Sequence, residues 1–155
     1  VIGEHHRQHS GSPSEQYDAS AENTGCLAVS RILMQRTDID RIVWRRRKNY
    51  LAWSQAVAPL AHCAALQPDL SDGCVPYMFP LRIEQPDSHF HLLKRQGMPV
   101  WRWDDMAVST CDVAMDYRTH LLHLPCHQEL SEAEMEWMAQ VLTSVMTKAR
   151  GHIFE

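Results

Sequence analysis

The sequence predicts an α+β domain in which a small three-stranded sheet packs against helices, with a long pair of helices at its N-terminal end. Three observations lead to this fold class. Apolar side chains recur every three or four residues from Ile39 to Ala64, which is typical of an amphipathic helix. Apolar residues alternate with others from Val75 to Ile83, which is the period of a strand. Ser131 and Glu134 have the spacing of a capping box at the start of a last helix.

The first half of the chain divides into a polar segment and two helices. Residues 1–23 are polar and lack apolar periodicity, so we expect a flexible lead-in before a single domain at 24–155. A helix is predicted over 24–36, with Leu27, Ile32 and Leu33 as its packing residues. A longer helix should begin after Thr37 or Asp38 and run to about Ala65, with a kink or an end at Pro59.

The second half supplies the sheet and two further helices. The strand at 75–83 carries two prolines on one side, Pro76 and Pro80, so it is predicted to lie at a sheet edge or to contain a bulge. A helix at 87–96 should stop at Gly97. Two further strands are expected, at 100–103 and 121–124, with a short helix near 109–117 between them. Met135, Met138, Leu142 and Val145 are the predicted buried stripe of the last helix.

Composition bounds the class of protein. The chain has 155 residues, 45% of them hydrophobic, which is enough for one domain with a real core. A formal net charge of −4, with arginines clustered locally, argues against nucleic-acid binding. No apolar run reaches the roughly 18 residues of a membrane helix. Five widely spaced cysteines indicate reduced thiols and a cytoplasmic location. Because the chain begins with Val1, we expect a fragment or a processed product.

Four short motifs occur in a particular order: Arg45–Tyr50, Gly73–Arg82, Gly97–Val100, and His120–His127 followed by Leu130–Glu134. In this order they resemble the C-terminal region of the DegT/DnrJ/EryC1/StrS family, over residues 24–147. That family consists of pyridoxal-phosphate (PLP) aminotransferases of the aspartate-aminotransferase fold type. The resemblance implies the small domain of an enzyme that transfers an amino group, commonly from glutamate, to a keto-sugar nucleotide. It also implies a homodimer and a large cofactor-binding domain, in the same enzyme or in a partner chain.

A PLP aminotransferase holds its cofactor through a lysine Schiff base. The chain has three lysines, Lys48, Lys94 and Lys148, all on predicted amphipathic helices. None has the small-residue setting after a strand that a cofactor lysine needs, and no glycine-rich phosphate loop is present. We therefore expect PLP to be bound by residues outside this chain, no catalytic residue within it, and no transamination by the chain alone.

The best candidates for substrate contact are Trp101, Arg102 and Trp103. Two aromatic rings beside an arginine give a planar cation with stacking surfaces, which suits a carboxylate or phosphate. The alternative is that both tryptophans belong to the core while Arg102 points to water. In the Arg45–Lys48 run, Arg46 falls nearest the apolar stripe and needs a carboxylate or several carbonyls as partners. A structural ion pair is the main expectation there, with a substrate role as the alternative, and Asn49 and Tyr50 are expected to pack at a domain junction.

The sequence gives weaker support to a metal site or a nucleophile site. His89 and His91 should diverge on a helix, His120 and His123 should face opposite sides of a strand, and Cys126 and His127 are adjacent, so no metal site is predicted. A nucleophile site built on Cys126 or Cys111 lacks an orienting third group. The competing function is a non-catalytic binding or assembly domain of the same fold. An excised small domain should also expose apolar surface and self-associate.

Overall fold

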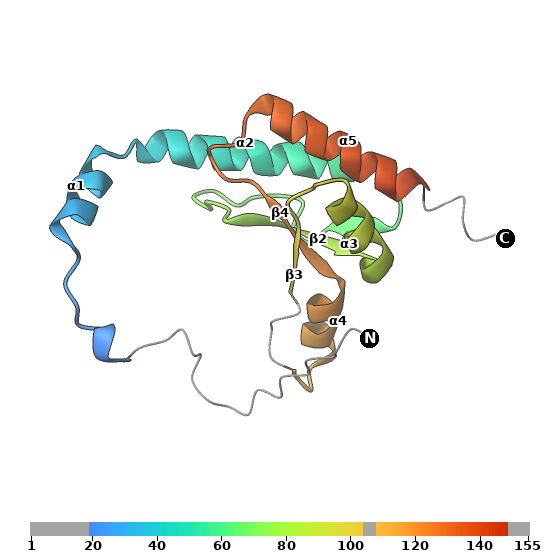
Figure 1. The fold of residues 1–155 in the computed structure, drawn as a ribbon, viewed down its shortest axis with the longest axis horizontal. Helices are drawn as coiled ribbons and strands as arrows, with labels where there is room; N and C mark the ends of the chain where they lie inside the picture. Colours follow the sequence, from blue (N-terminus) through green and yellow to red (C-terminus); the bar gives the residue numbers. More distant parts are fainter. Residues whose placement is uncertain (1–18, 104–107, 149–155) are drawn as a thin grey trace. The chain divides into compact units, whose positions relative to one another are not determined.

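The computed structural model describes residues 19–103 and 108–148 and contains an α+β fold (Figure 1). The fold class is the one the sequence predicts, with one more strand than expected. The chain divides into two compact units, Val1–Asp38 and Ile39–Glu155. The residues of the predicted lead-in up to Asp18 lie outside the described part. Within the described ranges, no helix combines the length and the apolar character needed to cross a membrane.

The first unit contains a short 3-10 turn, η1 (Ala19–Ala21), and one helix, α1 (Ala28–Arg36). The helix begins four residues later than predicted, and its N-cap, Leu27, makes no side-chain capping bond. The expected packing residues Leu27, Ile32 and Leu33 are all exposed, and α1 buries none of its residues. That prediction is wrong for the described residues of this unit, 19–38, because one helix and one turn offer these side chains no second apolar surface.

The second unit begins with the long helix α2 (Ile39–Val57). It ends at Val57 rather than near Ala65, and Pro59 follows within two residues. The chain then reverses at His62, which has a positive φ of 64°, and forms the edge strand β1 (Cys63–Ala65). Sequence periodicity extends the helix too far because β1 is a three-residue strand, too short to show a period of its own.

The sheet has four antiparallel strands in the order β1-β2-β4-β3. Besides β1 they are β2 (Met78–Ile83), β3 (Trp101–Arg102) and β4 (Leu121–Pro125). The strand β2 therefore lies inside the sheet, which corrects the expectation of an edge strand. Pro76 precedes the strand, and Pro80 is tolerated within it. Its carbonyl accepts a bond from the Leu66 amide (3.0 Å), so its missing N–H faces the point where β1 stops.

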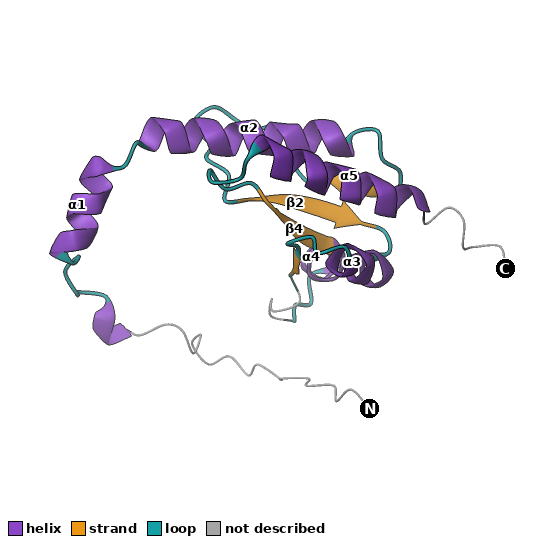
Figure 2. Cartoon of the chain, turned by 45° about the horizontal axis from the view of Figure 1, so that its top comes forward, coloured by secondary structure: helices purple, strands orange, loops and turns teal. Residues whose placement is uncertain are grey.

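One face of this sheet is covered by helices and forms the core (Figure 2). Phe79, Leu81 and Ile83 of β2 are fully buried there, as are Leu122 and Leu124 of β4. The helices α2, α3 (Pro86–Arg95) and α5 (Glu132–Lys148) complete it. Their buried residues include Trp53, Leu93, Met135, Met138, Leu142 and Val145. The predicted stripe of the last helix is confirmed.

Two helix ends have the local geometry that the sequence predicts. Gly97 follows α3 with a positive φ of 80°. Its amide bonds to Lys94 O (2.9 Å) while the Met98 amide bonds to Leu93 O (3.1 Å), which is a Schellman motif. At the start of α5, the Ser131 amide donates to Glu134 Oε2 (2.8 Å) and the Glu134 amide donates to Ser131 Oγ (3.2 Å). This is the expected capping box.

The opposite face of the sheet is only partly covered. The helix α4 (Asp112–His120) meets it through Asp116, whose carboxylate receives two hydrogen bonds of 3.0 Å from Arg82. These bonds hold the pKa of Asp116 below its usual range. The rest of this face carries Met78, Trp101 and His123, and we call it the open face of the sheet.

Candidate functional site

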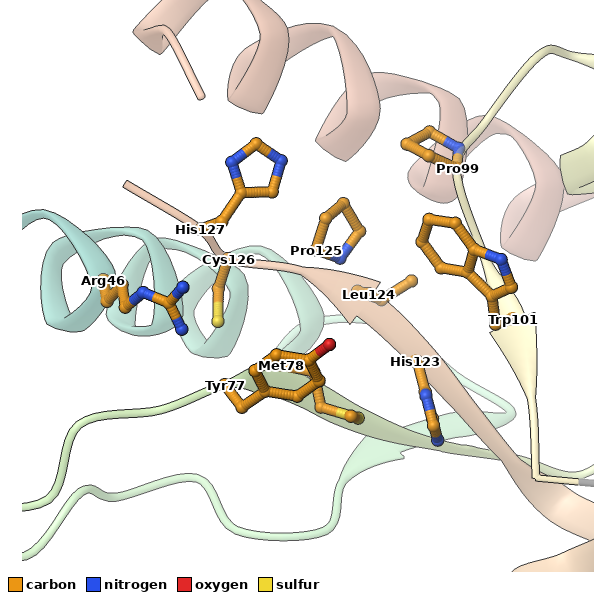
Figure 3. Close-up of a pocket in the computed structure, with 10 residues that line it drawn as sticks. All are labelled: Arg46, Tyr77, Met78, Pro99, Trp101, His123, Leu124, Pro125, Cys126 and His127. Carbon is orange, nitrogen blue, oxygen red and sulfur yellow. The ribbon is translucent and has the colours of Figure 1, made fainter. Parts of the chain in front are cut away.

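A pocket of about 430 Å³ lies on the open face (Figure 3). Strand register explains which side chains meet there. Trp101 pairs with His123, and Pro80 pairs with the same histidine from the other side, so the three residues share one face. The ten lining residues come from α2, from the start of β2, from the segment around β3 and from the end of β4: Arg46, Tyr77, Met78, Pro99, Trp101, His123, Leu124, Pro125, Cys126 and His127. None of the ten is acidic.

Arg46 supplies the cationic end of the pocket. Its Nε donates to Gln128 Oε1 (2.8 Å) and its Nη1 donates to Pro76 O (3.2 Å). Its guanidinium carbon also lies 6.0 Å from the centre of the Tyr77 ring. Both hydrogen-bond acceptors are neutral carbonyls, so the expected structural ion pair is absent among the described residues. Arg46 instead has the other kind of partner that was expected, several carbonyls.

The neighbours of Arg46 hold the loops that frame the pocket. Arg45 donates to the carbonyls of Gln128 (3.4 Å) and Leu130 (2.6 Å), and Arg47 to those of Ser71 (3.0 Å) and Cys74 (2.6 Å). The arginine run therefore ties α2 to two loops at once, because successive helical residues point in different directions.

Two buried residues of α2 add to this anchoring. Asn49 donates from Nδ2 to His127 O (2.9 Å), and the Tyr50 hydroxyl donates to Gln67 O (2.6 Å).

The aromatic walls of the pocket are exposed. Tyr77 is 77% and Trp101 is 55% accessible to solvent. Lys94 of α3 lies with its ammonium 5.5 Å from the centre of the Trp101 ring, which places a second cation beside this wall. Exposed aromatic surface next to a cleft is what a stacking contact with a ligand requires.

The polar groups deeper in the pocket are neutral near pH 7. Burial lowers the pKa of His123. Its Nε2 is buried without a hydrogen-bond partner among the described residues, and its ring meets Trp103 edge-on at 4.6 Å between centroids. Burial raises the pKa of the Cys126 thiol to about 11. A thiol of that pKa stays protonated and is a poor nucleophile.

The structure separates the three substrate-contact residues predicted from the sequence. Only Trp101 lines the pocket. Arg102 points to the other face, where it pairs with Asp87 (2.6 Å) and lies 5.6 Å from the centre of the Phe90 ring. Trp103 packs on His123. The alternative was that both tryptophans belong to the core and Arg102 points to water. It also fails in part, because Trp101 is exposed and Arg102 is held by a carboxylate. Alternation along a strand sends Trp101 and Arg102 to opposite faces.

The remaining candidates do not converge. Within residues 19–103 and 108–148, no group of three or more His, Cys, Asp and Glu side chains could hold a metal ion. His89 is buried and His91 is exposed, as their divergence on a helix predicts. The prediction for His120 is wrong. It is the last residue of α4 rather than part of a strand, and its Nδ1 lies 3.0 Å from Asp116 Oδ1.

Two of the three lysines, Lys48 and Lys94, have described side chains that lie outside the pocket. Lys48 is paired with Glu132 on the surface of α2. Lys94 lies over the rings of Phe90 and Trp101. Neither lines the pocket on the open face, and the side chain of Lys148 is outside the described residues. The described part of the chain therefore offers no lysine placed to hold the cofactor.

Comparison with known proteins identifies the fold. No family model and no curated protein matches the sequence. Among solved structures, the aminotransferase TlmJ of Streptoalloteichus hindustanus superposes with a TM-score of 0.66 at 16% identity, covering 78% of this chain and 35% of its own. A DegT/DnrJ/EryC1/StrS aminotransferase of Brucella abortus gives 0.57 at 15%, covering 76% and 34%. A protein of Streptococcus pneumoniae described as a sugar aminotransferase, in its PLP form, gives 0.61 at 13%, covering 76% and 34%.

These likenesses define a class of fold. The chain has the α+β fold of one segment of sugar aminotransferases of the DegT/DnrJ/EryC1/StrS type. It spans about a third of the length of the solved structures it matches.

Proposed function

We propose that this chain is the C-terminal portion of a PLP-dependent aminotransferase and corresponds to the small domain of that enzyme. The observation that carries the proposal is the superposition of 78% of the chain on about a third of a longer aminotransferase. The four sequence motifs, which resemble the same family, support it independently of the structure.

The finer features follow from the resemblance and the site. The substrate is a keto-sugar nucleotide with glutamate as the amino donor, and the whole enzyme is a cytoplasmic homodimer. PLP is held by residues outside this chain, in a large domain of the same enzyme or in a partner chain. The placement of Lys48 and Lys94 supports this arrangement, because both are engaged on the surface. The chain alone is inactive.

In this arrangement, the open face of the sheet forms one wall of the substrate cleft. Trp101 contacts the substrate through its exposed ring. Arg102, paired with Asp87, and Trp103, packed on His123, fix the short strand that carries Trp101. The described lining residues contribute binding surface, with Cys126 held as a protonated thiol, and we assign the chemistry of amino transfer to groups on the other side of the cleft.

A PLP absorbance titration tests the proposal. The chain should show no band of lysine-bound PLP, whereas the longer protein, or a mixture with its large-domain chain, should show one. If the isolated chain binds PLP through a lysine, the proposed location of the cofactor is wrong, and Lys48→Ala, Lys94→Ala and Lys148→Ala, each made alone, identify the residue. If the longer protein also fails to bind PLP, the aminotransferase assignment fails.

A second candidate is a non-catalytic binding or assembly domain derived from this fold. The self-contained core, which spans Tyr50 to Met146 without any contribution from the first unit, favours it. This candidate predicts a stable folded chain that carries a ligand pocket and never acquires PLP in any assembly. The titration above separates the two.

A further inference from the structure

We propose that the pocket on the open face is an anion-binding site belonging to this chain alone. It accepts a small molecule with an oxyanion, a phosphate or a carboxylate, attached to a flat apolar body. The anion binds Arg46 and the flat body lies against Trp101. The inference rests on the proposed function in that both place a ligand at Trp101, but the site is formed by residues of this chain, so its binding can be measured without a PLP-binding domain.

Arg46 carries a positive charge that no carboxylate among the described residues compensates. A guanidinium has five N–H donors, and the described contacts use two of them, one on Nε and one on Nη1. Both acceptors are neutral. Three other cations of this domain are paired with acids: Arg82 with Asp116, Arg102 with Asp87 and Lys48 with Glu132. Arg45 and Arg47 also bond to carbonyls, but of the three neighbouring arginines only Arg46 lines the pocket. Arg46 is half-buried at the pocket wall without a carboxylate among the described residues, and a bound oxyanion would supply one.

The Arg46 guanidinium is also held in a fixed orientation. The carbonyls of Gln128 and Pro76 fix the plane of the Arg46 guanidinium, which leaves the remaining donors, on Nη1 and Nη2, available to a ligand. A planar fork of N–H groups matches the two oxygens of a carboxylate or phosphate. An arginine that is already held in place loses less side-chain entropy on binding.

The shape and lining of the pocket suit a ligand that is charged at one end. Figure 3 shows Arg46 at one end and Trp101 at the other, with Leu124, Pro125 and Cys126 between them. The ligand therefore has its charge at one end and an apolar body along the floor. A volume of about 430 Å³ is in the range of small-molecule sites. None of the described lining residues is acidic, and Lys94 beside Trp101 adds positive potential.

Titration of the full chain with phenyl phosphate tests this inference, with binding measured by calorimetry and by the NMR shift of the Trp101 indole signal. Benzyl alcohol supplies a flat body without charge, and inorganic phosphate supplies charge without a flat body. Phenyl phosphate should bind saturably and at least about tenfold more tightly than either, because both ends of the pocket contribute. Benzoate should compete with it.

Three variants locate the site. Arg46→Gln should weaken phenyl phosphate binding by about tenfold, and Trp101→Ala should weaken it by several-fold while leaving inorganic phosphate unaffected. Arg95→Gln is the matched control, since Arg95 carries the same charge and is exposed at the end of α3 but does not line the pocket. It should bind as the unmodified chain does. If Arg46→Gln fails to fold, Trp101→Ala and Arg46→Lys, which keeps the charge but not the fork, provide the same comparison.

Two results would overturn the inference: unchanged binding in Arg46→Gln and Trp101→Ala, or an equal loss in Arg95→Gln, which would indicate diffuse attraction to a basic surface. Because no PLP and no second domain are present, neither result bears on the PLP titration. The two proposals therefore fail separately.

Discussion

The position of His89 opposes the stability of the fold. It lies on α3 with 1% of its surface exposed, and neither ring nitrogen has a partner among the described residues. Burial lowers its pKa, with a further contribution from His62, while Glu84 acts in the opposite direction. An imidazole in this setting is held neutral and carries an unrecovered desolvation cost.

This position predicts a loss of stability in mild acid. The pKa of His89 is lower in the folded chain than in the unfolded chain, where it is about 6.5. The unfolded state therefore binds more protons, and the free energy of unfolding falls as the pH drops below about 6.5. His89→Leu should raise that free energy by about 1 kcal/mol at pH 7.5 and flatten its decrease toward pH 5.

Urea unfolding of both proteins at several pH values measures this effect. His91→Leu is the control, because His91 is exposed on the same helix. Some acid sensitivity should remain in His89→Leu, since burial also lowers the pKa of His123. An unchanged pH dependence in His89→Leu would remove His89 as the cause.

Some residues of the site could be predicted from the sequence, and others could not. Trp101 was predicted from its place beside a strand, and it lines the pocket. The partners of Arg46 were missed, because Gln128 and Pro76 lie 82 and 30 residues away in the chain. Only the folded sheet brings them together. Strand alternation could have separated Trp101 from Arg102, but a two-residue strand gives no pattern from which to read its faces.

At the scale of elements, local signals in the sequence predicted two helix ends correctly, the start of α5 and the end of α3. The capping box of α5 and the glycine after α3 depend on residues within a few positions of each other, so the sequence contains all the necessary information. The strand β1 was missed for the opposite reason. Cys63–Ala65 becomes a strand only through pairing with Leu81–Ile83, and its composition carries no strand preference.

Gly97 offers a test of a helix end. An alanine there would meet no atom within 4 Å, but it would have to adopt a φ of about +80°. The cost is therefore conformational, and Gly97→Ala should lower the free energy of unfolding by about 1 kcal/mol.

Gly25→Ala is the matched control for this change. Its added methyl group also meets open space, and its φ is not in the positive range. It should stay within about 0.5 kcal/mol of the unmodified chain. Equal effects of the two substitutions, measured by thermal or urea unfolding, would show that the Schellman turn does not require glycine.

At the scale of the whole molecule, the two units carry very different shares of the core. The hydrophobic core lies entirely in the second unit, and α1 buries no residue. A chain starting at Ile39 should therefore fold cooperatively, with a free energy of unfolding within about 0.5 kcal/mol of the full chain. Circular dichroism during urea unfolding measures this. Loss of the cooperative transition would mean that residues 1–38 contribute to the core after all.

The same truncation tests the expected self-association. Leu27, Ile32 and Leu33 of α1 are exposed, and exposed apolar side chains of this kind favour contacts between molecules. Light scattering after size-exclusion chromatography should give a higher mass for the full chain, relative to its monomer, than for the truncated one. A clean monomer for the full chain at high concentration would contradict this expectation.

The proline inside β2 has a consequence for aggregation. On its β1 side, β2 is paired only as far as Pro80, whose carbonyl accepts a bond from the Leu66 amide, and the part of β2 before Pro80 has no partner in β1. A foreign strand that tried to extend the sheet there would find no amide donor at Pro80 and a carbonyl already occupied by Leu66. Strand addition needs a continuous row of free donors and acceptors. The proline therefore protects against edge-to-edge stacking of this sheet, at a position where an ordinary residue would leave a template open.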